Sequence, residues 1–316
     1  MDSPLLRIAR RVALSAITVL GAITVAFFAL RLVPVDPAFV IAGAGNDAVA
    51  ITAEVLRAIR TEYHLDRPLP VQYLLYLARL AHGDLGISYV QEQPVVGLIA
   101  EQARPTLALA GLASAFAVAI SLADGVFTAG RRRTGAVANL VELVLASTPV
   151  FWIGFLLMLL FSVKWRLFPL LDAGDLRTLI LPALTIALPT AAPLAQVLRR
   201  SMEDVLEQPF IMTARARGLS VLAVKLRHGL RHALIPYLTM LGFSFGALLG
   251  GAAITETLFG RPGLGRLLVN AVTRQDMPLV LGLVTVSTLA FVIVNTLIDF
   301  AYILIDHRLK AVLPQP

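Results

Sequence analysis

The sequence predicts an all-α membrane protein with six transmembrane helices. Hydrophobic residues make up 58% of the chain and charged residues only 15%, whereas a soluble domain has about 25% charged residues. The chain also holds six apolar runs of about 20 residues, the length that crosses a bilayer core. These runs lie at about 12–33, 105–128, 136–163, 178–200, 233–258 and 279–305, and we expect a single transmembrane domain over 1–316.

The first and fourth runs need separate justification. The N-terminal segment has a basic start and a long apolar run, whereas a signal peptide has a shorter apolar core and a small-residue cleavage site. We therefore expect a retained first span. The fourth run contains Pro182, Pro189 and Pro193, and prolines are tolerated in membrane helices that neighbouring helices surround.

Two polar segments separate the spans. The segment 34–98 is too long for a simple turn, so we expect a small extracellular substructure there. The segment 201–232 is expected to be the longest cytoplasmic loop. Lysine and arginine concentrate on one side of the membrane, and the positive-inside rule predicts that both termini are cytoplasmic. The basic residues on that side are Arg7, Arg10, Arg11, Arg131, Arg132, Arg133, Arg199, Arg200, Arg215, Arg217, Lys225, Arg227, Arg231, Arg308 and Lys310.

Composition and motifs exclude several functions. The chain has no cysteine, which rules out disulfides and thiolate metal sites. Its net charge of +7 comes from short basic clusters between apolar runs, a pattern of membrane topology rather than of nucleic-acid binding. The only lysines are Lys164, Lys225 and Lys310, and none follows a glycine. The chain therefore lacks the P-loop that ATP hydrolysis would need.

The stretch TARARGL, residues 213–219, predicts a short helix that ends at Gly218, because alanine and arginine favour helices and glycine ends them. Ser220 is placed to cap a second helix over Val221–Leu230. A compact helical knob of this kind suits docking to another protein. The alternative is a solvated loop whose arginines only set the topology and bind anionic lipid.

Four blocks of the chain resemble one family in the expected order. TARARGLS followed by RHGLRHALIP resembles the cytoplasmic loop of permease subunits in ABC importers of the dipeptide, oligopeptide and nickel group. The blocks at 65–89, 259–282 and 295–310 resemble other parts of the same permeases. The departures are Thr213 in place of the glutamate of other ABC importers, Gly229 for alanine, Val35 for glycine and His307 for proline.

The resemblance implies a permease subunit that forms half of an ATP-driven import pathway for peptides or a similar small solute in a bacterial inner membrane. It implies two ATPase subunits, a second homologous permease and an extracellular solute-binding protein as partners. ATP and magnesium would sit on the ATPases, and this chain would hold no cofactor and would not be an enzyme. An ion-gradient-driven secondary transporter is the alternative. The implied ATPase-docking loop comprises Thr213, Ala214, Arg215, Ala216, Arg217, Gly218 and Leu219.

Two further patterns have simpler interpretations. GFSFG at 242–246 matches the hydrolase pattern G-x-S-x-G but lies inside an apolar span, and that motif needs a strand, a sharp turn and a nearby histidine. We expect Gly242, Gly246 and Gly250 to form a helix-packing face instead. His64 and His82 lack the spacing of a metal site and are expected on the surface.

Polar groups in or near the spans are candidates for a transport pathway or for buried pairs, because ionisable side chains are costly in a membrane. They are Glu142, Gln196, Glu256 and Asp299. The segment 259–278, with its GRPGLG turn signals, is a candidate contact for the binding protein or part of an outer gate.

Overall fold

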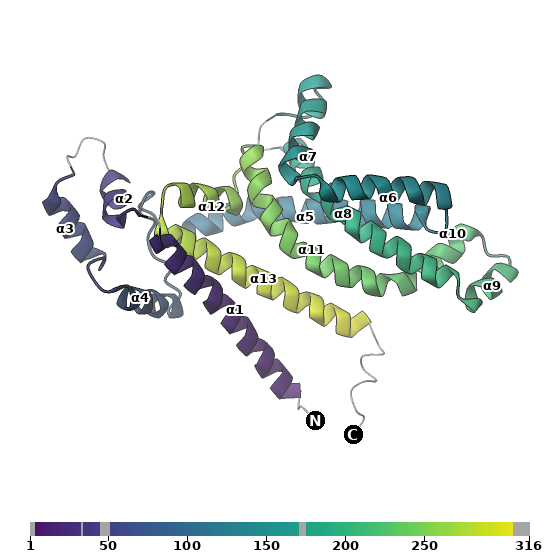
Figure 1. The fold of residues 1–316 in the computed structure, drawn as a ribbon, viewed down its shortest axis with the longest axis horizontal. Coiled ribbons are helices and arrows are strands. Elements are labelled where there is room, and N and C mark those ends of the chain that lie inside the picture. Colours follow the sequence, from purple (N-terminus) through teal and green to yellow (C-terminus); the bar gives the residue numbers. More distant parts are fainter. Residues whose placement is uncertain (1–3, 33, 45–50, 171–174, 306–316) are drawn as a thin grey trace. The chain divides into compact units, whose positions relative to one another are not determined.

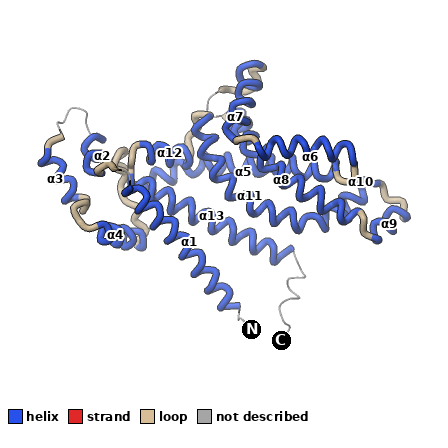
Figure 2. Tube along the Cα trace, viewed as in Figure 1, coloured by secondary structure: helices blue, strands red, loops and turns tan. Residues whose placement is uncertain are grey.

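The computed structural model describes residues 4–32, 34–44, 51–170 and 175–305. Helices dominate the described part (Figure 1, Figure 2), and the β-structure found there is an isolated bridge between Ile87 and Pro94. The prediction of an all-α protein is therefore confirmed for these residues. Contacts divide the chain into two compact units, Met1–Arg104 with Pro262–Val292, and Pro105–Arg261 with Ile293–Pro316.

Helices α5 and α13 each run through both units. The first unit also holds α1 (Pro4–Leu32), α2 (Pro37–Ala44), α3 (Ala53–Glu62), α4 (Leu69–Ala81) and α12 (Leu264–Thr273), with the start of α5 (Val95–Thr128) and most of α13 (Met277–Ile305). The second unit holds α6 (Arg132–Ser147), α7 (Val150–Leu157), the π-helix η1 (Met158–Lys164), α8 (Arg177–Leu206), α9 (Pro209–Ala216), α10 (Val221–Val224), the π-helix η2 (Lys225–Gly229) and α11 (Leu230–Leu258).

Four of the described helices are long and apolar enough to cross a membrane, and a bent pair would make a fifth. The four are Ala13–Leu32, Val95–Thr128, Arg177–Leu206 and Met277–Leu297. Helix α11 covers the range expected for another span. The chain is thus a multi-pass helical membrane protein, and the count of six remains a prediction.

The expected third span, 136–163, is not a straight helix. It is a pair of helices, Arg132–Ser147 and Val150–Lys164, that meet at an angle of 107° (Figure 1). The break falls at Thr148 and Pro149, where Thr148 is extended. Proline lacks a backbone N–H and disfavours helical geometry in the residue before it, so the first helix ends there.

Helix α8 is the centre of the second unit. Within its apolar window 67% of residues are buried, against 28% for α5. Its three prolines lie inside the helix without ending it. Alanines recur every four residues on α8, and small residues at this spacing let a neighbouring helix approach closely. Ala183 packs with Leu109 and Ala113 of α5, and Ala187 and Ala191 pack with Ala117.

Two glycines allow neighbouring helices to approach closely: Gly154 of α7 lies against α8 and α11, and Gly125 of α5 lies against α8. A Cβ at Gly154 on α7 would lie 2.6 Å from Leu258 Cδ2 and 2.9 Å from Thr185 Cγ2. A Cβ at Gly125 on α5 would lie 2.7 Å from Leu198 Cδ2. Both positions therefore require glycine for the observed contact with their neighbours.

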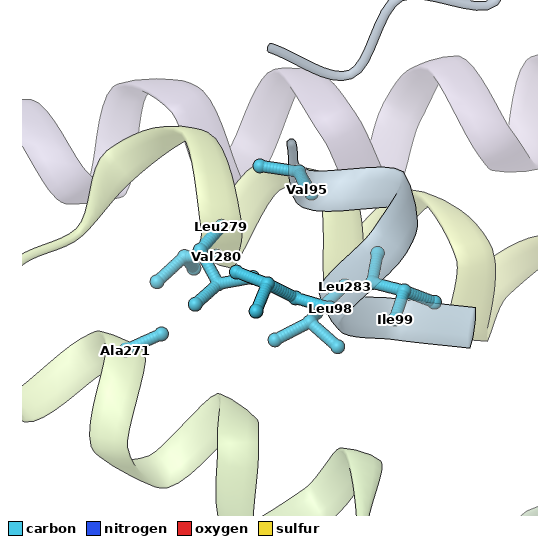
Figure 3. Packing of buried hydrophobic residues seen from close by; sticks show 7 residues of the cluster. All are labelled: Val95, Leu98, Ile99, Ala271, Leu279, Val280 and Leu283. Atoms are coloured by element: carbon cyan, nitrogen blue, oxygen red, sulfur yellow. The ribbon is translucent and has the colours of Figure 1, made fainter. Parts of the chain in front are cut away.

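The first unit is organised around the start of α13. Buried side chains from α5, α12 and α13 form one cluster there (Figure 3), namely Val95, Leu98, Ile99, Ala271, Leu279, Val280 and Leu283. The buried Asp276 precedes α13 and accepts hydrogen bonds from Ser88 Oγ, from the backbone N–H of Tyr89 at 3.1 Å and from that of Leu279 at 3.4 Å. One carboxylate thus caps a helix and secures the segment before α5.

The described residues of the segment 34–98 include α2, α3 and α4, and its place outside the membrane stays a prediction. Asp36, before α2, pairs with Arg60 of α3. Burial opposes ionisation of Asp36, but the hydrogen bonds from Arg60 and from the Ala38 N–H, together with the charges of Arg60 and Arg31, lower the pKa of Asp36. Helix α4 is secured to α1 by a 2.6 Å hydrogen bond between Tyr73 and Thr24 hydroxyls. Tyr89 packs edge-on against Tyr63, and burial raises the pKa of Tyr89 to about 12.

Candidate functional site

The candidate site is the segment 209–229, which connects the two long helices α8 and α11. Its first part, α9, begins at Pro209 and ends at Ala216. Proline suits the first helical position because its missing N–H would have no partner there. Gly218 follows with a φ of +82°, and its N–H donates to the Arg215 carbonyl at 2.9 Å. This is the left-handed helix end for which glycine is preferred.

The second part of the segment begins as predicted but ends differently. Ser220 caps α10, and its hydroxyl accepts from the Ala223 N–H at 3.3 Å. We expected one helix over Val221–Leu230. The structure has a single turn of α-helix followed by the π-helix η2, which passes directly into α11. The helical backbone therefore continues from η2 into the next long helix.

A small core of its own holds the segment together. Ile211 and Ala214 of α9 pack against Val224 of α10, with Leu219 from the turn beside them. Val205 and Leu206 from the end of α8 complete this core. Ala214 is therefore a packing residue and not part of an exposed docking face. The segment is an ordered helical hairpin fastened to α8.

The outer surface of the hairpin combines apolar and cationic groups. Met212 is 73% exposed and Val221 58%, and Phe210 and Leu222 are also exposed. We call these four residues the apolar tip. Large exposed apolar side chains outside the expected spans are candidates for a surface that a partner covers. Of the predicted docking residues, Thr213, Arg215, Ala216, Arg217 and Gly218 are exposed, and Leu219 is half-buried.

Lys225 anchors the hairpin to the neighbouring helix α5, which the sequence did not reveal. It is only 4% exposed, and its Nζ donates to the Val126 carbonyl at 2.9 Å. Val126 lies in the last turn of α5, whose carbonyls lack helical partners and favour a positive charge. Burial lowers the pKa of the Lys225 ammonium. Nearby, Glu203 of α8 accepts from the Gly130 N–H at 3.1 Å.

Arg199 belongs to the basic residues expected on the cytoplasmic side, and that side stays a prediction. The structure buries Arg199 between α5, α6 and α8. Its guanidinium pairs with Glu142 of α6, lies 3.9 Å from Asp124 of α5, and donates to Thr128 Oγ1 at 3.0 Å. Glu142 was flagged from the sequence, but its partners come from helices distant in the chain, so no local pattern could identify them.

The other flagged polar groups have separate positions. The fully buried Glu256 of α11 accepts from Thr106 Oγ1 of α5 at 2.6 Å. Arg261, after α11, donates to Thr178 Oγ1 of α8 at 3.1 Å. Gln196 is half-buried on α8. Asp299 lies on α13 beyond the residues whose side-chain surroundings the structure describes, and His307 lies outside the described residues.

The structure describes the exposure of two of the three glycines in the predicted packing face. Gly242 is buried, whereas Gly250 is exposed and an added Cβ would meet nothing within 4 Å. The surroundings of Gly246 are not described, so the packing face stays a prediction. Ser244, the central residue of GFSFG, lies on a continuous helix and donates to the Met240 carbonyl at 2.9 Å. This is the usual arrangement of a helical serine, not that of a nucleophile elbow.

No group of three potential metal ligands occurs within the described ranges. His82 forms a 2.7 Å contact between Nδ1 and the Ala78 carbonyl at the end of α4, and both His64 and His82 are exposed. The segment 259–278 forms a turn at Gly260 and then α12, and its residues line a cavity of about 380 Å³ with Val90, Gln91 and Gln102.

Comparison with known proteins identifies the family. Residues 105–311 match the family described as "Binding-protein-dependent transport system inner membrane component", and residues 5–110 match the N-terminal family of the same membrane components. A glutathione transport system permease protein, GsiC, of Pectobacterium atrosepticum is 38% identical over 301 residues, covering 93% of this chain and 95% of the relative.

Two further relatives are similar along nearly their whole lengths. The GsiC protein of Escherichia coli is 37% identical over 286 residues, with 90% of this chain and 92% of the relative covered. A putative peptide transport system permease protein of Brucella abortus is 38% identical over 313 residues, with 96% and 98% covered. With its apolar helices and a family match over most of its length, the chain belongs to the inner membrane permease components of binding-protein-dependent transport systems.

Proposed function

We propose that this chain forms half of the translocation pathway of an ATP-driven importer for peptides or a chemically similar small solute such as glutathione. The cargo class is suggested by the names of the relatives, which are glutathione and peptide permeases. The proposed assembly contains two ATPase subunits, a second homologous permease and an extracellular solute-binding protein. The chain would cross the membrane six times, with both termini in the cytoplasm.

The hairpin 209–229 is proposed to dock on a separate ATPase. The observation that carries this assignment is the exposed apolar tip on a rigid hairpin, with Arg215 and Arg217 beside it. Apolar anchors with a cationic rim are typical of interfaces between proteins. A hairpin fastened to α8 by its own core and to α5 by Lys225 can transmit displacement of the tip into the helices. Such transmission is what an importer driven by a separate motor requires.

The test is to extract the tagged chain in mild detergent and identify all co-purifying proteins by mass spectrometry. Recovery of P-loop ATPases and of a second permease supports the proposal. Recovery of this chain alone, still moving solute in liposomes without ATP, would instead support an ion-gradient-driven transporter.

A variant pair makes the docking assignment specific. Met212→Asp places a charge in the apolar tip, where it would be buried unpaired against a partner. We expect recovery of the ATPases to fall about tenfold or more, as for loss of an interface hot spot. Leu226→Asp is the matched control, because Leu226 is exposed on η2 outside the tip. Equal ATPase recovery with both variants would contradict docking through the tip.

A further inference from the structure

The buried charges between α5, α6 and α8 do not balance. Arg199 supplies one positive charge, and both Glu142 and Asp124 contact it. Two ionised carboxylates against one guanidinium leave one negative charge, which either a proton shared between the two acids or a further cation must compensate. Glu142 is only 3% exposed, and an uncompensated charge in such a place is strongly unfavourable.

The surroundings of one Glu142 oxygen indicate where a compensating positive charge would bind. Glu142 Oε2 accepts from Arg199, whereas Oε1 is buried and has no hydrogen-bond donor among the described residues. The side chain beside it is Asp124. Without a proton shared between the two acids, the Asp124 carboxylate is also only an acceptor. A positively charged hydrogen-bond donor would satisfy both carboxylates and restore neutrality.

A cavity of about 580 Å³ adjoins these two carboxylates. Glu142 and Asp124 line it, and most of its remaining surface is apolar, from Ile120, Val137, Val141, Leu145, Leu188 and Ala191. Arg133 also lines the cavity, but it lies nine residues before Glu142 on α6, a separation of roughly 14 Å along a helix. Arg133 is therefore not the missing donor. The volume lies in the range of small-molecule sites.

We propose that this cavity binds a primary ammonium group that carries an apolar substituent, with the ammonium donating to Glu142 and Asp124. The N-terminal end of a peptide has this chemistry. The proposal rests on the proposed import of peptides for its biological meaning, but binding itself can be measured without transport. Arg199 holds the two carboxylates in place and is a positioning residue.

The test uses equilibrium dialysis of the full chain in lipid nanodiscs, alone and together with the partners that co-purify with it. The probe is leucinamide, which has an ammonium group and an isobutyl side chain but no carboxylate. N-acetyl-leucinamide is the matched neutral probe. We expect leucinamide to bind about tenfold or more tightly than the acetylated probe, because a hydrogen bond between charged groups in a buried site contributes that much.

Three variants separate the site from general effects on the protein. Glu142→Gln removes the uncompensated charge and should abolish the preference for leucinamide. Val141→Phe fills the cavity with the carboxylates intact and should weaken binding of leucinamide by a similar factor. Glu101→Gln is the control, because Glu101 is an exposed acid on α5 away from the cavity, and it should bind leucinamide as the unaltered chain does.

Equal binding of the two probes, or unchanged leucinamide binding by either cavity variant, would overturn the proposal. Binding that disappears when the partners are present would overturn it as well, because a partner helix would then occupy the cavity. Co-purification of the ATPases is scored on the same preparation. Failure of the ammonium site is thereby distinguished from failure of the importer assignment.

Discussion

Gly218 allows the backbone geometry of the hairpin 209–229 to be tested without disturbing its packing. Its φ of +82° lies in the left-handed region, and an added Cβ would meet no atom within 4 Å. A substitution there changes the energy of the backbone and adds no steric contact. The Gly218 N–H also donates to the Arg215 carbonyl at 2.9 Å, so a residue without an N–H has a second effect.

These facts predict an order of severity for three variants. Gly218→Asn should be mild, because asparagine occurs in the left-handed position at helix ends. Gly218→Ala should raise the free energy of the turn by about 1–2 kcal/mol, because the left-handed conformation is that much less favourable for a residue with a Cβ. Gly218→Pro should prevent the turn, because proline is held at a φ of about −65° and lacks the N–H. Destabilising the turn by about 1–2 kcal/mol lowers the ratio of intact to opened turn about 5- to 30-fold.

The assay is ATP-dependent uptake by the assembled importer in proteoliposomes, with the amount of chain per vesicle matched and ATP hydrolysis measured in parallel. If the hairpin couples the two processes, uptake per ATP should fall in the order Asn, Ala, Pro. Thermal unfolding of the chain should change little, since Gly218 is exposed and outside the helix-packing core. Normal uptake per ATP by Gly218→Pro would refute the reasoning.

Two further predictions concern packing and anchoring. Gly154→Ala should lower the free energy of unfolding by about 1–3 kcal/mol, because the added methyl group has no room between its neighbouring helices. The thermal unfolding midpoint should therefore fall. Gly250→Ala is the control, and its midpoint should not fall because Gly250 is at an open position. A result in which both variants unfold alike would contradict the close contact. Lys225→Met should leave the α5 carbonyl buried without its donor, at a cost of about 1–3 kcal/mol. Hydrogen exchange of α10 and η2 should then accelerate, with the exposed Lys164→Met as control, and unchanged exchange would rule out the anchoring role.

Several features of the hairpin were predictable because they depend on neighbours in sequence. A glycine at a helix end and a serine immediately before the next helix each make hydrogen bonds with residues only a few positions away. Gly218 and Ser220 occupy those positions in the structure. The length of the second helix was predicted wrongly, because the π-helical turn at Lys225–Gly229 depends on packing against α5 and α8 rather than on propensity.

The third span shows a similar limit. Hydropathy treated 136–163 as one apolar run, since averaging over a window conceals a single break. The proline at 149 was visible in the sequence, but prolines at 182, 189 and 193 lie within an unbroken α8. Local sequence therefore does not decide which proline breaks a helix; the packing available on each side of it does.

Composition and hydropathy determined that this is a helical membrane protein, and the four blocks that resemble the permease family implied its class and the loop at 213–219. The helical signals of that loop come from residues that interact within a few positions. Only the tertiary structure showed that Arg199 and Lys225 are buried and which acids face Arg199. The energy of a charge depends on its surroundings. Here those surroundings come from residues 57 to 99 positions away, from Glu142 beside Arg199 to Val126 beside Lys225.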